Sequence, residues 1–128
     1  MKYYHEKTLK KLSFEEAVQK VTDALKEEGF GVLTEIDVKA TLKKKLDVDF
    51  YDYKILGACN PPFAYKALLA ENKIGAMLPC NVIVQQSDDG VEVAAVDPVA
   101  SMQAIENKDL EGIAEEIQSK LKAVIESL

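Results

Sequence analysis

The sequence predicts an α+β domain in which an antiparallel sheet of about five strands carries helices packed on it. Short segments in which apolar and polar residues alternate recur along the chain, as expected of strands with one buried face. A serine followed three residues later by a glutamate marks the start of a helix near the N-terminus. The C-terminal segment repeats apolar residues at helical spacing over about five turns. The expected order is strand, helix, strand, strand, strand, strand and a long last helix, with short extra helices between them.

The first strand and the first helix are predicted from alternation and from capping residues. Residues 3–9 alternate between apolar and polar side chains, which favours a strand. Ser13 and Glu16 form a capping box, and apolar residues follow at helical spacing. Gly29 is expected to end this helix because glycine tolerates the left-handed conformation that follows many helices.

A second strand and a short helix should follow. Residues 30–37 alternate again, and we expect this strand to run antiparallel to the first or to lie beside it. Asp37 is a suitable cap for a short helix whose lysines 43–45 face solvent. The apolar residues expected to face the core from this helix are Val38, Leu42 and Leu46. Residues 47–52 are acidic and aromatic, and we expect them to be irregular.

The middle of the chain predicts a third strand that leads directly into a helix. Residues 53–59 form the strand, and Pro61 and Pro62 end it because proline cannot donate a ladder hydrogen bond. The helix should run to about Asn72, and the side chains expected to be buried on it are Phe63, Ala67, Leu68 and Tyr65. Residues 74–79 form an apolar connection, which we expect to pack against the body of the domain.

The C-terminal part predicts a hairpin followed by the last helix. Residues 80–86 and 91–96 are expected to be strands joined by a turn at residues 87–90, where Gly90 supplies a positive φ. Asp97 then caps a short turn or helix. The last helix begins near Asn107. We therefore expect residues 1–128 to form a single domain, without a repeat or linker that divides them.

Composition and charge narrow the possible classes of function. Hydrophobic residues make up 48% and charged residues 30% of the chain, which is typical of a globular domain. The apolar runs are too short for a membrane span, and the N-terminus lacks the apolar segment of a secretory signal. The net charge of −6 disfavours nucleic-acid binding, which needs a basic surface. We expect a cytoplasmic protein with neither a membrane nor a nucleic-acid partner.

Both cysteines lie in short segments that also contain asparagine and proline. The two segments read Cys59-Asn60-Pro61 and Pro79-Cys80-Asn81. A thiol is nucleophilic as the thiolate, and a helix N-terminus, such as the one expected after Cys59, lowers its pKa. Asparagine amides can orient a ligand or stabilise an oxyanion. However, His5 is the only histidine, and it reaches Cys59 only if the first and third strands are neighbours. The sequence therefore assigns no catalytic residue.

Other roles of the cysteines stay open. A buried free cysteine behaves as a small apolar residue, and turn chemistry explains the neighbouring asparagines and prolines. A redox pair of Cys59 and Cys80 would require their Cα atoms to lie within about 7 Å. Two cysteines and one distant histidine fall short of the four ligands of a closed zinc site, unless a two-fold dimer shares the site. Asp97, at the end of an apolar strand, is a further candidate, although helix capping also explains it.

The cysteine motifs resemble those of DUF302, a bacterial and archaeal family of domains of unknown function. The matching residues are Cys59, Asn60, Pro61, Pro79, Cys80, Asn81, Asp97 and Pro98. The resemblance implies a curved antiparallel sheet with a long C-terminal helix, similar in outline to the TATA-binding-protein class, and a homodimer. It supplies no established activity, and therefore no catalytic residue and no cofactor. The likeness to a DNA-binding fold carries no function by itself.

Three hypotheses follow for the function. The first is a small homodimeric binding domain with a pocket for a small ligand or a metal. The candidate ligand-binding residues are Cys59, Asn60, Pro61, Cys80, Asn81 and Asp97. The second is a thiol-based redox or nucleophilic enzyme that uses Cys59 with Cys80. The third is a structural or interaction module with both cysteines in the core. Binding is favoured over catalysis because no base accompanies the thiols.

Overall fold

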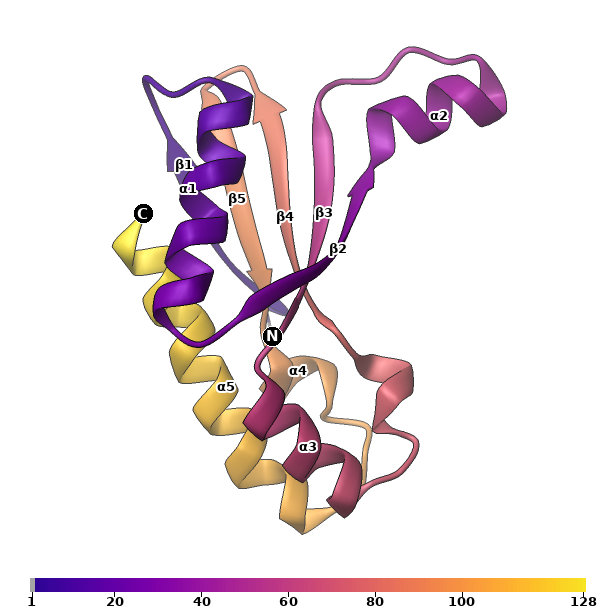
Figure 1. Ribbon diagram of the computed structural model, residues 1–128, viewed down its shortest axis with the longest axis vertical. Coiled ribbons are helices and arrows are strands. Elements are labelled where there is room, and N and C mark those ends of the chain that lie inside the picture. Colours follow the sequence, from indigo (N-terminus) through magenta and orange to yellow (C-terminus); the bar gives the residue numbers. More distant parts are fainter. Residues whose placement is uncertain (1) are drawn as a thin grey trace.

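A computed structural model describes residues 2–128 and confirms the α+β fold. Five strands form one curved antiparallel sheet (Figure 1). The strands are β1 (Tyr4–Leu9), β2 (Gly31–Asp37), β3 (Tyr53–Cys59), β4 (Cys80–Ser87) and β5 (Gly90–Val96). Their order across the sheet is β1-β5-β4-β3-β2.

The expectation that the second strand lies beside the first is wrong. β1 and β2 are the two opposite edges of the sheet, and β1 pairs with β5 from Tyr4–Val96 to Leu9–Val91. Each of the strands β2, β3 and β4 pairs antiparallel with the strand that follows it, which leaves one edge of β5 free for β1. Alternation in a sequence indicates which residues share a face of a strand, but it does not specify which strands pair.

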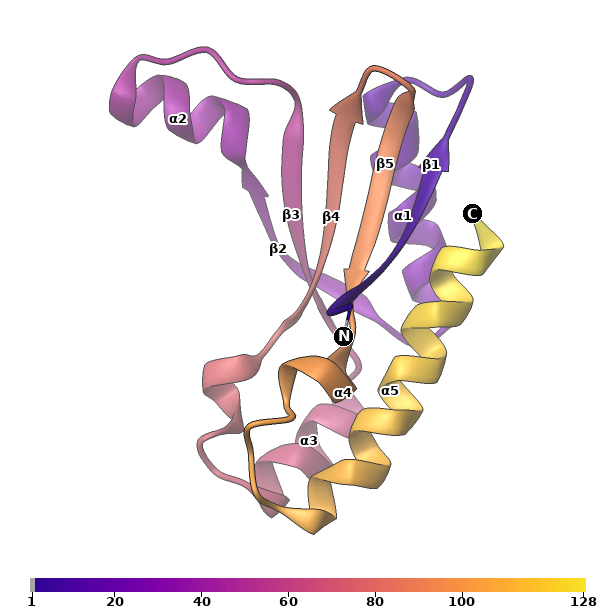
Figure 2. The same cartoon turned by 180° about the vertical axis from the view of Figure 1, so that it is seen from behind.

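Two helices, α1 (Phe14–Glu27) and α5 (Lys108–Ser127), cover one face of the sheet and leave the other open (Figure 2). The capping box is confirmed, because Ser13 Oγ accepts from the Glu16 N–H at 3.1 Å and Glu16 Oε1 accepts from the Ser13 N–H at 3.0 Å. Gly29 follows α1 with a φ of 85°. The fully buried large side chains between these helices and the sheet include Val21, Leu25, Leu56, Val82, Val84, Val93, Leu121 and Val124.

The short helix α2 (Val38–Leu46) projects from the body of the domain at the far end of β2 and β3 (Figure 1). Asp37 caps it as expected, since its Oδ1 accepts from the Ala40 N–H at 2.9 Å. No residue of α2 is buried, and Leu46 is 66% exposed, so the expectation that Leu46 faces the core is wrong. The helix extends beyond the sheet, where no core exists for it to cover.

A second layer lies beyond the other end of the sheet. It contains α3 (Pro61–Ala70), the 3-10 turn η1 (Ile74–Met77), α4 (Pro98–Ser101) and the first turns of α5 (Figure 1). Ile74 is fully buried, in agreement with the expectation that its apolar segment packs inward. On α3, Ala67 is buried, but Leu68 is 43% exposed and Tyr65 is 65% exposed, so the expectation for these two residues is wrong. Within residues 2–128, no helix combines the length and the apolar character that crossing a membrane requires.

Candidate functional site

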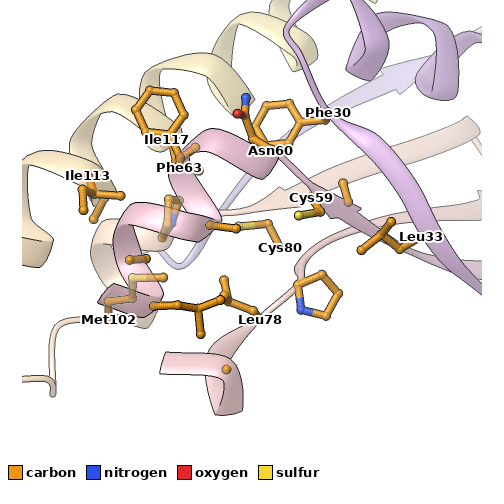
Figure 3. Close-up of a pocket in the computed structure, with 18 residues that line it drawn as sticks. Phe30, Leu33, Cys59, Asn60, Phe63, Leu78, Cys80, Met102, Ile113 and Ile117 are labelled. Carbon is orange, nitrogen blue, oxygen red and sulfur yellow. The ribbon is translucent and has the colours of Figure 1, made fainter. Parts of the chain in front are cut away.

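A cavity of about 340 Å³ lies at the end of the sheet where β3 leads into α3 and β4 begins (Figure 3). Its wall is almost entirely apolar. The largest side chains that line it are Phe30, Phe63, Leu78, Met102, Ile113 and Ile117. These side chains come from the start of β2, the segment before β4, the C-terminus of α4, and from α3 and α5. The cavity therefore lies between the sheet and the second layer.

Local sequence explains why the chain turns at this place. Asn60 is the N-cap of α3, and Pro61 and Pro62 occupy the first positions of the helix, where their missing N–H groups are not needed. The same prolines cannot continue the β3 ladder. The strand therefore ends at Cys59 and the helix begins two residues later, at the edge of the cavity.

The two cysteines lie at the same end of neighbouring strands. Ala58 of β3 stands directly opposite Cys80 of β4, and Cys59 is the next residue along β3. Both thiols are free and both residues line the cavity, with Cys80 buried and Cys59 half-buried (Figure 3). Burial, with a smaller contribution from the charge of Cys59, raises the pKa of Cys80 to about 11. The Cys80 thiol is therefore protonated at neutral pH and is a poor nucleophile.

Asn60 has a structural partner as well as a place in the cavity wall. Its side-chain nitrogen donates a hydrogen bond of 3.2 Å to the backbone carbonyl oxygen of Glu28, the C-cap of α1. The side chain makes no capping hydrogen bond with α3. Asn60 therefore joins the end of α1 to the junction of β3 and α3.

Gly57, three residues before Asn60, permits a close approach of three segments. A Cβ atom at this position would lie 2.3 Å from Thr34 Oγ1 of β2 and 2.8 Å from Pro79 Cγ. Only glycine leaves room for these two side chains in their present positions. A glycine in the interior of a predicted strand is the signal in the sequence for this crowding.

The other candidate residues do not line this cavity. Asn81 lies on the open face of the sheet, and Pro61 is exposed at the start of α3. Asp97 does not line the cavity, although its neighbour Pro98 does. The structure therefore brings together Cys59, Asn60 and Cys80, while the rest of the predicted set is distributed around them.

Asp97 has its own hydrogen-bond network. Its carboxylate accepts from the Val99 and Ala100 N–H groups at 2.9 and 3.3 Å and from Gln118 Nε2 at 2.9 Å, and His5 Nε2 lies 3.2 Å from Asp97 Oδ2. Burial raises the pKa of Asp97, but the hydrogen bonds and the nearby His5 outweigh it and leave the pKa below its ordinary value. The network caps α4 and connects it to α5 and β1.

The cavity contains no side chain suited to act as a base towards Cys59. His5 is on β1, which β5 and β4 separate from β3, and its contact is with Asp97. Across residues 2–128, no three side chains of His, Cys, Asp or Glu are grouped as ligands for a metal ion. The arrangement is suited to contact with an apolar molecule, with polar atoms limited to the region of the thiols and Asn60.

Sequence reasoning did not identify most of this wall. Met102, Ile113 and Ile117 occur in apolar helical patterns that look the same whether the side chain faces a packed core or a cavity. Phe30 was assigned to a strand face. The only usable signal was the pair of cysteine motifs, which mark two edges of the cavity.

Comparison with known proteins agrees with this fold and identifies the family. The model of the family described as "Domain of unknown function DUF302" matches residues 5–128. The crystal structure of an uncharacterized conserved protein DUF302 from Bacillus stearothermophilus is similar, with a TM-score of 0.90, 27% sequence identity and coverage of 98% of both chains. The comparison with curated proteins found no match. Because the family model covers nearly the whole chain, this protein belongs to the DUF302 family.

Proposed function

We propose that this protein is a binding domain for a small apolar molecule, held in the cavity beside Cys59 and Cys80. The observation that carries the proposal is the cavity itself, whose volume of about 340 Å³ and apolar wall are typical of small-molecule sites. The apolar body of the ligand would contact Phe63 and Met102. Its polar end, if present, would lie near Asn60, the most polar side chain of the wall.

A neutral fluorescent probe tests this proposal directly. N-phenyl-1-naphthylamine brightens when it enters an apolar site, and we expect saturable binding to the protein. Ala64→Phe, which adds bulk to the cavity wall, should abolish the signal. Leu69→Phe adds bulk to the exposed face of the same helix and should not. Equal binding by both variants, or no saturable binding by the unmodified protein, would contradict the proposal.

Thiol labelling provides an independent readout of the same cavity. Cys59 is half-buried in the wall, so an occupant should slow its reaction with a disulfide reagent such as 5,5′-dithiobis(2-nitrobenzoate). Cys59→Ser should remove the accessible reaction and leave Cys80 unreactive until the protein unfolds. If a saturating concentration of N-phenyl-1-naphthylamine left the labelling rate of Cys59 unchanged, the probe would have to bind elsewhere.

The proximity of the cysteines favours a second candidate, a redox pair. Exchange with added glutathione disulfide would form a bond between the two Sγ atoms and break the glutathione S–S bond. The two electrons and the two thiol protons pass to the glutathione, which leaves as two glutathione thiols. The raised pKa of Cys80 means that Cys59 would be the attacking thiol. Mass spectrometry after oxidation tests this candidate: persistent free thiols, or glutathione adducts alone, would contradict a Cys59–Cys80 disulfide.

We also propose that a second copy of the chain covers the edge formed by β2 and the α2 arm. β2 is an edge strand whose Leu33 is 67% exposed, and exposed strand edges with apolar side chains are prone to pairing. Further exposed apolar residues on this part of the chain are Ile36, Leu46, Val48 and Tyr51. Leu33 also lines the cavity, so a partner at this edge would approach the cavity mouth.

Light scattering after size-exclusion chromatography tests the dimer. The unmodified protein should have the mass of two chains, and Leu33→Lys should shift it to one. Leu69→Lys, an equally exposed position on α3, is the matched control and should leave the dimer intact. A monomeric unmodified protein would contradict the proposal.

A further inference from the structure

Figure 2 shows the open face of the sheet, which α1 and α5 do not cover. A second cavity, of about 450 Å³, lies on this face. Unlike the apolar cavity beside the cysteines, it has aromatic and acidic walls. Three tyrosines, Tyr3, Tyr4 and Tyr53, line it together with Glu6 and Glu92. These residues lie at the start of the described chain, on β1, on β3 and on β5.

Strand register explains why these side chains share one face. Glu92 of β5 stands opposite Gln85 of β4, which stands opposite Tyr53 of β3, so the three residues form one row across the sheet. Tyr4 and Glu6 are two positions apart on β1 and therefore point to the same side. Tyr3 packs edge-on against Tyr4, with ring centroids 4.9 Å apart. The rings and carboxylates thus belong to one surface.

The two carboxylates of this surface lack ion-pair partners among the described residues. Among the described residues, neither Glu6 nor Glu92 takes part in an ion pair, and Glu92 only accepts a hydrogen bond from Gln85 at 3.2 Å. Burial raises the pKa of Tyr53, and the nearby Tyr51, Tyr3 and Glu92 raise it further, so the region disfavours additional negative charge. An ammonium group is already present at the edge, because Lys2 Nζ lies 5.5 Å from the centroid of the Tyr4 ring.

We propose that this open-face cavity binds a small organic cation through its tyrosine rings and the carboxylates of Glu6 and Glu92. Aromatic faces attract ammonium groups electrostatically, most strongly where water is partly excluded. The negative charge of the carboxylates compensates for the hydration that a cation loses when it leaves water. Binding of an anion is disfavoured here, because it would be repelled by two carboxylates that have no ion-pair partner within residues 2–128. This site is independent of the apolar cavity and of the function proposed for it.

Intrinsic fluorescence gives a direct readout of the site. The chain has no tryptophan and five tyrosines, three of which line this cavity, so ligand binding there should change the tyrosine emission. Choline and spermidine serve as cationic probes. The neutral isostere 3,3-dimethyl-1-butanol has the shape of choline without its charge. We expect saturable binding of choline or spermidine with a dissociation constant of about 1 mM or tighter, and no saturation with the isostere.

Charge-removing variants locate the binding. Glu92→Gln keeps the acceptor oxygen for Gln85 but removes the negative charge, and it should weaken cation binding by about fivefold or more. Glu27→Gln removes the same charge from the exposed end of α1 and should leave the affinity unchanged. Glu6→Gln, at an exposed position, provides a second test if Glu92→Gln fails to fold, and it should weaken binding in the same direction.

Three outcomes would overturn the proposal. The first is the absence of saturable change with both cations. The second is equal binding of choline and its neutral isostere, which would indicate an apolar rather than a cationic ligand. The third is equal weakening by Glu92→Gln and Glu27→Gln, which would indicate long-range attraction to an acidic protein without a site. None of these outcomes bears on N-phenyl-1-naphthylamine binding at the other cavity.

Discussion

The side-chain nitrogen of Asn60 donates a 3.2 Å hydrogen bond to the backbone carbonyl oxygen of Glu28. Asn60 is buried, and its amide also lies 3.2 Å from the position that a Cβ atom would take at Gly29. The turn after α1 is therefore held against the start of α3. This turn is distant from the Cys59 motif in the sequence but lies next to it in the structure. Part of the motif thus has a structural role even if the cavity binds a ligand.

Replacement of Asn60 should destabilise the domain. Asn60→Ala leaves the Glu28 carbonyl oxygen without this donor, and we expect the free energy of unfolding to fall by about 1–3 kcal/mol. Asn72→Ala, at an exposed asparagine just after α3, is the matched control and should have little effect. Urea denaturation measures both. Equal stability of the two variants would show that the hydrogen bond contributes nothing.

The crowding at Gly57 predicts a second stability effect. Gly57→Ala places a Cβ atom against the side chains of Thr34 and Pro79, and the displacement of these neighbours should cost about 1–3 kcal/mol. Gly75→Ala meets no atom within 4 Å and serves as the control. Thermal unfolding of the two variants measures the difference. A Gly57→Ala protein as stable as the control would mean that β2 and Pro79 move apart freely.

The buried thiol predicts a loss of stability in alkaline solution. The pKa of Cys80 is raised from 9.0 to about 11 in the folded protein, so the folded state holds the proton more tightly than the unfolded chain. The resulting stabilisation is fully present below pH 9.0 and is lost as the pH rises to about 11. The loss should amount to on the order of 2–3 kcal/mol.

Cys80→Ala tests the origin of this alkaline loss. The variant should be less stable near neutral pH because it removes buried volume, but its stability should fall less between pH 9.0 and about 11. Urea denaturation at several pH values measures the slope for both proteins. Parallel slopes in the two proteins would assign the alkaline loss to other groups.

Asp97 predicts the opposite dependence in acid. Its pKa is lowered in the folded protein, so its contribution to stability is present above the ordinary value of 3.8 and is lost as the pH falls through the lowered value. Asp97→Asn should lower the free energy of unfolding at neutral pH by about 1 kcal/mol or more, because a charged acceptor of several hydrogen bonds is lost. The difference from the unmodified protein should shrink in strong acid.

The exposed residue Asp88 in the β4–β5 turn provides the control for this acid dependence. Asp88→Asn removes one carboxylate without a buried network, so its stability should follow that of the unmodified protein across the acid range. Thermal unfolding at a series of pH values compares the two variants. A gap between Asp97→Asn and the unmodified protein that stays constant in acid would contradict the assignment.

The sequence predicted local features better than long-range ones. The capping box at Ser13, the end of α1 at Gly29 and the cap at Asp37 are confirmed because each depends on residues within one or two turns. The position of β2 was wrong because strand partners depend on the whole sheet. Leu46 was placed inward because helical spacing reveals an apolar stripe but not whether anything stands opposite it.

The candidate site shows the same contrast between local and long-range features. Cys59 and Cys80 were linked by their similar motifs, and the pairing of β3 with β4 places them side by side. Asn81 belongs to the second of these motifs, but strand alternation turns its side chain to the open face of the sheet. Asp97, the candidate outside the motifs, caps α4. The apolar side chains of α5 that complete the wall carry no signal that distinguishes them from core residues.

The pairing of β1 with β5 has a consequence for the order in which the domain folds. β1 is the first strand of the chain, yet its partner is the last, whereas β3, β4 and β5 each pair with a neighbour in sequence. Contacts between distant segments form slowly, because the loop between them must be closed before any contact is gained. We therefore expect β1 to join the sheet only after β5 has paired with β4. Until then, the edge of β5 that β1 covers in the folded domain would remain unpaired and open to another strand.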